Sequence, residues 1–139
     1  IDPKKKMMFN PAESIDFNGN TGPFIQYTYA RIQSLLAKAD YKKQDLEKVE
    51  INTFEKELIM QLANYRQIIQ KAADNLSPAL VANYIYDLVK TYNSFYQNNP
   101  ILSQEDQNIR QMRLYLSDVT AKVIKRSLAL LGIDTVDRM

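Results

Sequence analysis

The sequence predicts an all-α protein, an antiparallel bundle of four main helices. Glycine occurs 3 times in 139 residues, which is fewer than the tight turns of a sheet built from short strands usually require. Apolar residues recur every third or fourth position in four long stretches, a spacing that places them on one face of a helix. Short polar segments separate these stretches, and short connections favour neighbouring helices that run antiparallel.

The first helix is expected over residues 23–38. Thr21 or Gly22 would cap it, and Pro23 suits the first turn because the amide hydrogen that proline lacks has no partner there. The apolar residues of this helix fall on two adjoining stripes, and such a helix is either deeply buried or presents one stripe to a partner. Residues 39–51 carry alternating charges and are expected to form a solvated loop or a short helix.

The second and third helices have clear start signals. Asn52 followed by Glu55 predicts a capping box, in which each side chain accepts a hydrogen bond from the other residue's backbone amide. Helical spacing then continues without a break, and we expect this second helix to end near Asp74. Ser77 and Pro78 predict the start of the third helix, as a cap followed by a first-turn proline.

The fourth helix is expected after a loop that follows Tyr96. Ser103 is the predicted cap, with Glu105 and Asp106 in the first turn, where the helix dipole favours negative charge. Gly132 is a natural stop, since glycine readily adopts the left-handed conformation that ends many helices.

Composition excludes several kinds of chemistry. The chain has no cysteine and no histidine, which removes disulfides, thiolate sites and the commonest general base and metal ligand. A net charge of +2 permits nucleic-acid binding without arguing for it. The carboxylates lie on polar faces, and we expect Glu55 and Glu57 to be solvated. The sequence has no phosphate-binding glycine loop and no metal-ligand spacing, so it predicts no catalytic centre.

The composition is that of a soluble, intracellular protein. No apolar run approaches the ~18 residues that a transmembrane helix needs. The lysines at 4–6 are not followed by an apolar stretch, so the start of the chain does not resemble a signal peptide. A first residue of Ile1 rather than methionine indicates a piece of a longer chain.

The aromatic residues of the first helix are the most informative feature. Phe24, Tyr27 and Arg31 share one helical face within two turns. Two rings beside a guanidinium can hold unstacked RNA bases, although such a stripe can also be part of the core. Two basic clusters, residues 4–6 and the set Lys122, Lys125 and Arg126, are either phosphate contacts or solvated faces.

Several stretches of the chain resemble arginyl-tRNA synthetases. Residues 10–32 are similar to the segment in which the catalytic region of these enzymes joins the first helix of the anticodon-binding domain. Residues 22–31 match the family pattern Gly-Pro-aromatic-x-Gln-Tyr-x-x-Ala-Arg throughout, and Tyr29 stands where a histidine is common. The other similar stretches are residues 92–96, 100–102, 113–116, 130–133 and 137–139.

The resemblance implies the helical C-terminal anticodon-binding domain, of the DALR type, of a class I aminoacyl-tRNA synthetase. Residues 1–20 would be the irregular junction with a catalytic domain, and residues 21–139 the helical domain. Enzymes of this family ligate arginine to its tRNA using ATP. ATP and magnesium would bind the catalytic domain, whereas the present segment would hold no cofactor and no catalytic residue.

The resemblance also implies a binding site for the anticodon loop of arginine tRNA. The central anticodon base, a cytosine in most arginine tRNAs, would be flipped out and held against aromatic rings. Gln26 would have a structural role, directed at the catalytic domain. The protein is expected to act as a monomer in the cytoplasm, away from membranes. The residues expected at the anticodon site are Phe24, Tyr27, Ala30, Arg31, Ser34, Tyr96 and Met139.

Three other interpretations compete with this one. A helical bundle could bind another protein through the same aromatic face and have no affinity for RNA. A related anticodon domain from a cysteine-type or methionine-type synthetase would share the helical plan, but the Gln26-Tyr27 pair and the Arg138-Met139 ending argue against it. A stand-alone enzyme is disfavoured by the absence of histidine, cysteine and a phosphate loop.

Overall fold

The computed structural model describes residues 10–11, 19 and 21–139. Most of the predicted junction segment, including the lysines at 4–6, lies outside these residues. In the described part the chain is helical and contains no strand, so the predicted all-α class is confirmed. The helices are α2 (Gly22–Lys38), α3 (Thr53–Ala63), α4 (Tyr65–Asp74), α5 (Pro78–Asn98) and α6 (Gln107–Leu130).

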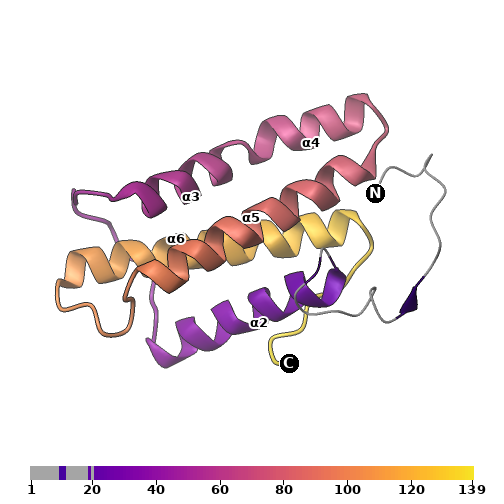
Figure 1. Ribbon diagram of the computed structural model, residues 1–139. Coiled ribbons are helices and arrows are strands. Elements are labelled where there is room, and N and C mark those ends of the chain that lie inside the picture. Colours follow the sequence, from indigo (N-terminus) through magenta and orange to yellow (C-terminus); the bar gives the residue numbers. More distant parts are fainter. Residues whose placement is uncertain (1–9, 12–18, 20) are drawn as a thin grey trace.

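The helices form a bundle around α5 and α6. Helix α5 packs against α3 and α4 on one side and also contacts α2 and α6, while α2 lies mainly along α6 (Figure 1). Helices α3 and α4 follow one another along the same edge, so together they form the second of the four main helices. The predicted four-helix plan is therefore confirmed, with one interruption.

The interruption falls at Asn64, where sequence spacing predicts an unbroken helix. The backbone of Asn64 stays close to helical (φ −72°, ψ −12°), and its amide still donates to the Met60 carbonyl oxygen at 3.2 Å. Its own carbonyl oxygen accepts from the Ile68 amide at 3.1 Å. Periodicity did not reveal the break because the chain keeps its helical direction and hydrogen bonds through it.

Helix α2 begins as the sequence predicts. The Thr21 hydroxyl oxygen accepts a hydrogen bond from the Phe24 amide at 3.4 Å, and Pro23 lies in the first turn. The helix ends at Lys38, also as predicted. The following segment, residues 41–52, has no helical turn. It is therefore a loop rather than the short helix that the sequence also allowed.

The predicted capping box of α3 is confirmed, but the prediction for Glu55 is wrong. Its Oε2 accepts from the Asn52 amide at 2.7 Å, and the Asn52 side chain accepts from the Glu55 amide at 3.1 Å. Glu55 is buried rather than solvated, because its Oε1 also pairs with Nε of Arg113 at 2.7 Å. Arg113 in turn donates to the Pro100 carbonyl oxygen at 2.7 Å, so the pair joins three segments. Glu57 is exposed, as expected.

The N-cap of helix α6 lies three residues after the predicted cap, Ser103. The N-cap is Asp106, whose carboxylate accepts from the amides of Asn108 at 2.9 Å and Ile109 at 3.1 Å. A carboxylate that satisfies two free amides is a strong cap, and this one lies closer to the apolar repeat than the serine does. At α5 the predicted start is right, although the Ser77 hydroxyl makes no capping hydrogen bond.

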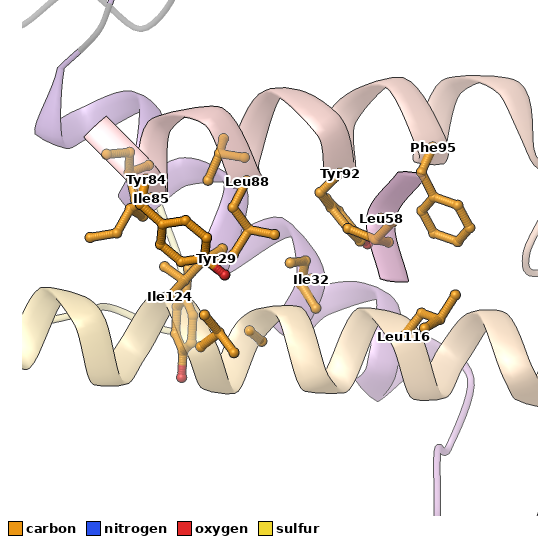
Figure 2. Close-up of a cluster of buried hydrophobic side chains, with 14 of the residues drawn as sticks. Tyr29, Ile32, Leu58, Tyr84, Ile85, Leu88, Tyr92, Phe95, Leu116 and Ile124 are labelled. Carbon is orange, nitrogen blue, oxygen red and sulfur yellow. The ribbon is translucent and has the colours of Figure 1, made fainter. Parts of the chain in front are cut away.

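The core is a continuous layer of apolar side chains between α2, α5 and α6, closed on one side by α3. Figure 2 shows Ile32 of α2, Leu58 of α3 and Ile124 of α6 meeting the buried face of α5. Tyr92 and Phe95 of α5 are fully buried. The Tyr92 hydroxyl donates to Oγ of Ser117 at 3.1 Å, and burial raises its pKa, so it stays a neutral hydrogen-bond donor.

Gly132 ends α6 as predicted and redirects the chain. It has φ +71°, and its amide donates to the Ala129 carbonyl oxygen at 3.0 Å while the Ile133 amide donates to that of Leu128 at 3.0 Å. This pair of bonds is a Schellman motif. The residues beyond it return toward α2, and in Figure 1 the end of the chain lies beside that helix.

Leu76 ends α4 in the same left-handed conformation without being glycine. Its φ is +49°, and its side chain is 91% exposed, so the strain is not offset by burial. Holding a residue that has a Cβ in the left-handed conformation costs about 1–2 kcal/mol. Glycine avoids this cost, but its greater freedom in the unfolded chain cancels roughly half of the gain. We expect Leu76→Gly to raise the free energy of unfolding by about 0.5–1 kcal/mol. Urea denaturation of both proteins measures this, and a decrease in stability would contradict it.

Candidate nucleic-acid interface

The aromatic face of α2 is partly open rather than sealed in the core. Tyr27 is 44% exposed, and Phe24 and Arg31 are half-buried. The neighbouring stripe of the same helix, which includes Tyr29 and Ile32, takes the core positions. The two apolar stripes seen in the sequence therefore divide into one buried stripe and one available stripe.

Arg31 is held at the centre of this face. Its guanidinium carbon lies 5.8 Å from the centre of the Tyr27 ring and 4.9 Å from the centre of the Tyr96 ring. One terminal nitrogen donates a hydrogen bond to Oδ1 of Asn93. The buried Nε atom has no acceptor among the described residues. A cation between two rings and anchored by an amide has little freedom to move, so the surface is preorganised.

A cavity of about 520 Å³ opens beside Arg31. Its walls combine aromatic rings and a thioether with two amide side chains, those of Asn93 and Gln97. This mixture suits a flat ring that carries hydrogen-bonding edges, such as a nucleobase. The lining residues are Phe24, Tyr27, Thr28, Arg31, Asn93, Gln97 and Met139.

A second, smaller cavity of about 350 Å³ adjoins the first. The two cavities share Tyr27, Arg31 and Met139, and the second adds Ala30, Ser34 and Arg138. Ala30 is buried and Ser34 is exposed.

The structure thus brings the seven expected site residues together. Six of them line the two cavities, and Tyr96 joins them through its contact with the Arg31 guanidinium. Sequence reasoning missed Thr28 and Arg138 at the cavity walls, and it also missed Asn93 and Gln97. The last two lie on α5 four residues apart, next to Tyr96, and this spacing was a signal that could have identified them.

Gln26 has a structural role, as expected, but its partner is within this chain. Its Nε2 donates to the Asp134 carbonyl oxygen at 2.8 Å. This bond fixes the segment that follows Gly132 against the start of α2. The segment then carries Arg138 and Met139 to the two cavities.

The other basic cluster lies away from these cavities. Lys122, Lys125 and Arg126 are exposed on α6, and Lys122 pairs with Asp118 at 2.7 Å. None of the three lines either cavity.

The described residues include neither a cluster of metal ligands nor a helix that could span a membrane. In that part of the chain, no group of three or more acidic, histidine or cysteine side chains is placed to hold a metal ion. None of the described helices combines the length and apolarity required to cross a bilayer.

Comparison with known proteins identifies the family of this chain. Residues 25–139 match the family model of the DALR anticodon binding domain. The whole chain aligns with an arginine–tRNA ligase from Flavobacterium psychrophilum at 58% identity, and the alignment covers 23% of that protein's length. It also aligns with the arginine–tRNA ligase of Porphyromonas gingivalis, at 48% identity over 144 aligned residues. That alignment covers 24% of the relative's length. The chain thus spans about a quarter of the length of these relatives.

Solved structures show the same fold. The arginyl-tRNA synthetase of Thermus thermophilus superposes with a TM-score of 0.92 and 29% identity, over 99% of this chain and 24% of that one. The arginyl-tRNA synthetase of Plasmodium falciparum superposes with a TM-score of 0.83, over the whole of this chain and 25% of the other. Its sequence identity is 24%, so this similarity concerns the fold alone. With a family match that covers all but the first turn of α2 and the residues before it, the chain belongs to the DALR anticodon binding domain family.

Proposed function

We propose that this chain recognises the anticodon loop of arginine tRNA as one domain of an arginyl-tRNA synthetase. The observation that carries the proposal is the pair of adjoining cavities around Tyr27, Arg31 and Met139. These residues occupy the positions at which the resemblance to arginyl-tRNA synthetases implies an anticodon site.

The larger cavity would take the central anticodon base. Bases of a loop are easier to unstack than those of a duplex, and a flipped base could stack on the Tyr27 ring. Each stack of this kind contributes about 1–3 kcal/mol. The amides of Asn93 and Gln97 offer both donors and acceptors, which suits the Watson–Crick edge of cytosine.

The chemistry of the complete enzyme would lie outside this chain. We propose that the full-length protein ligates arginine to its tRNA with ATP, and that ATP and magnesium bind a separate catalytic domain, which is the second partner of this domain. In this proposal the present chain supplies recognition only, and the protein acts as a monomer in the cytoplasm.

A binding titration tests the proposal. The domain is titrated with an arginine-tRNA anticodon stem-loop and with one whose central cytosine is replaced by guanine, at one fixed salt concentration because phosphate contacts are salt-dependent. We expect the replacement to weaken binding about tenfold or more, since loss of the paired hydrogen bonds to one base edge costs about 1–3 kcal/mol. Equal affinity for both loops would contradict the proposal. No affinity for either would favour the alternative, a helical bundle that binds protein.

Removing the anchor of Arg31 gives a further prediction. Asn93→Ala should weaken binding of the cytosine stem-loop about two- to tenfold, because the Arg31 side chain would then have to be ordered on binding, at a cost of about 0.5–1.5 kcal/mol. Asn98→Ala is the matched control, since its exposed amide donates to the Ser94 carbonyl oxygen of the same helix and lines neither cavity. Fluorescence anisotropy with both variants measures the difference. Equal affinities of the two variants would show that Asn93 does not position the site.

A further inference from the structure

We infer that the smaller cavity is a phosphate site, and that it takes a backbone phosphodiester of the anticodon loop. This inference rests on the proposed function and adds a second contact to it. The residues that carry the inference are Arg138, Arg31 and Ser34, which line this cavity together with Tyr27, Ala30 and Met139.

The side chains that line this cavity carry a net positive charge. It is lined by two arginines, Arg31 of α2 and Arg138 of the segment after α6, and none of its other lining side chains is charged. Among the described residues, no carboxylate lies within 4.0 Å of either group. With a net charge of only +2 on the whole chain, the presence of two cations at one small cavity is a local feature. An anionic ligand is therefore favoured there.

The remaining lining selects among anions. Guanidinium groups present paired donors that match two oxygens of a phosphate, and the Ser34 and Tyr27 hydroxyls add further donors. The side chain of Ala30 is small and buried, so it leaves room at the wall without offering a polar group. Compared with the larger cavity, this one lacks the second ring and the two amides that would recognise a base.

Contiguity identifies the source of the phosphate. The two cavities share Tyr27, Arg31 and Met139, so a group bound in one lies next to the other. A nucleotide whose base fills the larger cavity carries phosphates one sugar away. A linkage adjoining the flipped nucleotide is therefore the group that reaches Arg138, in preference to a free phosphate ion.

The fold holds Arg138 in place for this contact. The left-handed turn at Gly132 sends the chain back, and the Gln26 amide fixes it at the Asp134 carbonyl oxygen, 2.8 Å away. Four residues further on, Arg138 reaches the cavity.

The test combines charge removal on both partners. Anticodon stem-loops with a neutral methylphosphonate at one loop linkage at a time are titrated against the domain and against Arg138→Gln. In the unchanged domain, neutralising one linkage beside the central base should weaken binding about three- to fivefold, the scale of an exposed ion pair. In Arg138→Gln, neutralising the same linkage should have no effect on affinity. The contact is already lost in that variant, so removing its other partner changes nothing further.

Arg126→Gln is the matched control, since it removes an exposed arginine that lines neither cavity. It should show the same linkage dependence as the unchanged domain. If Arg138→Gln also keeps that dependence at every linkage, the phosphate site is refuted. The outcome is separable from the proposed function, because discrimination of the central base in the unchanged domain stands or falls in its own titration.

Discussion

Glu55→Ala is expected to lower the free energy of unfolding by about 3–5 kcal/mol, the largest stability loss among the changes considered, because it leaves a buried guanidinium without its counterion. Glu55 is 1% exposed and Arg113 is 7% exposed, so water cannot replace the lost carboxylate. The same carboxylate also caps α3 through the Asn52 amide. The change therefore removes a cap and an ion pair together.

Glu57→Ala is the matched control, since its carboxylate is exposed two residues along the same helix. Its effect should stay within about 0.5 kcal/mol. Urea denaturation with both variants gives the comparison. Similar free energies for the two variants would mean that the Arg113 ion pair does not stabilise the bundle.

Tyr27→Ala is expected to weaken binding of the cytosine anticodon stem-loop about 5- to 150-fold, which corresponds to the ~1–3 kcal/mol of one base stack. The melting temperature should change little, because the ring is 44% exposed and the core stripe of α2 lies on its other side. Tyr27→Phe is the matched control. It keeps the ring and should retain most of the affinity.

Anisotropy titrations and thermal melts of the three proteins separate binding from folding. A Tyr27→Ala protein that melts early yet binds the stem-loop normally would assign the ring to the core. That outcome would remove the basis for the site.

Helix boundaries could be predicted wherever a single local interaction sets them. The Asn52–Glu55 box, the Thr21 cap and the Gly132 stop depend on residues within a few positions of one another. The start of α6 was harder because Ser103 and Asp106 are both good caps. The choice between them depends on which carboxylate or hydroxyl reaches the free amides.

The burial of Glu55 could not be predicted from its neighbours in sequence. Its partner, Arg113, is 58 residues away, and the two meet only because α3 and α6 pack together. A charged residue is usually exposed unless it is paired, and the pairing is a property of the tertiary structure. Sequence spacing alone therefore predicted an exposed carboxylate, which is the usual case, rather than the buried one that the structure contains.

The candidate site could be predicted only where its residues lie on one helix. Phe24, Tyr27 and Arg31 share a face because they belong to one helix, and helical geometry is enough to show it. The approach of Asn93 and Gln97 depends on how α5 lies against α2. The position of Met139 follows from the turn at Gly132 and the Gln26 bond, so only the resemblance to a family indicated it.

Photocrosslinking from the central anticodon position tests most directly whether a base lies against the α2 rings. A stem-loop with 5-iodocytidine at that position keeps its Watson–Crick edge, is bound to the domain and irradiated, and the crosslinked peptides are sequenced by mass spectrometry. We expect crosslinks to Tyr27, Tyr96 or Met139, which surround Arg31 and the larger cavity. Crosslinks confined to α3 and α4, with none to these three residues, would place the base elsewhere and contradict the proposed site.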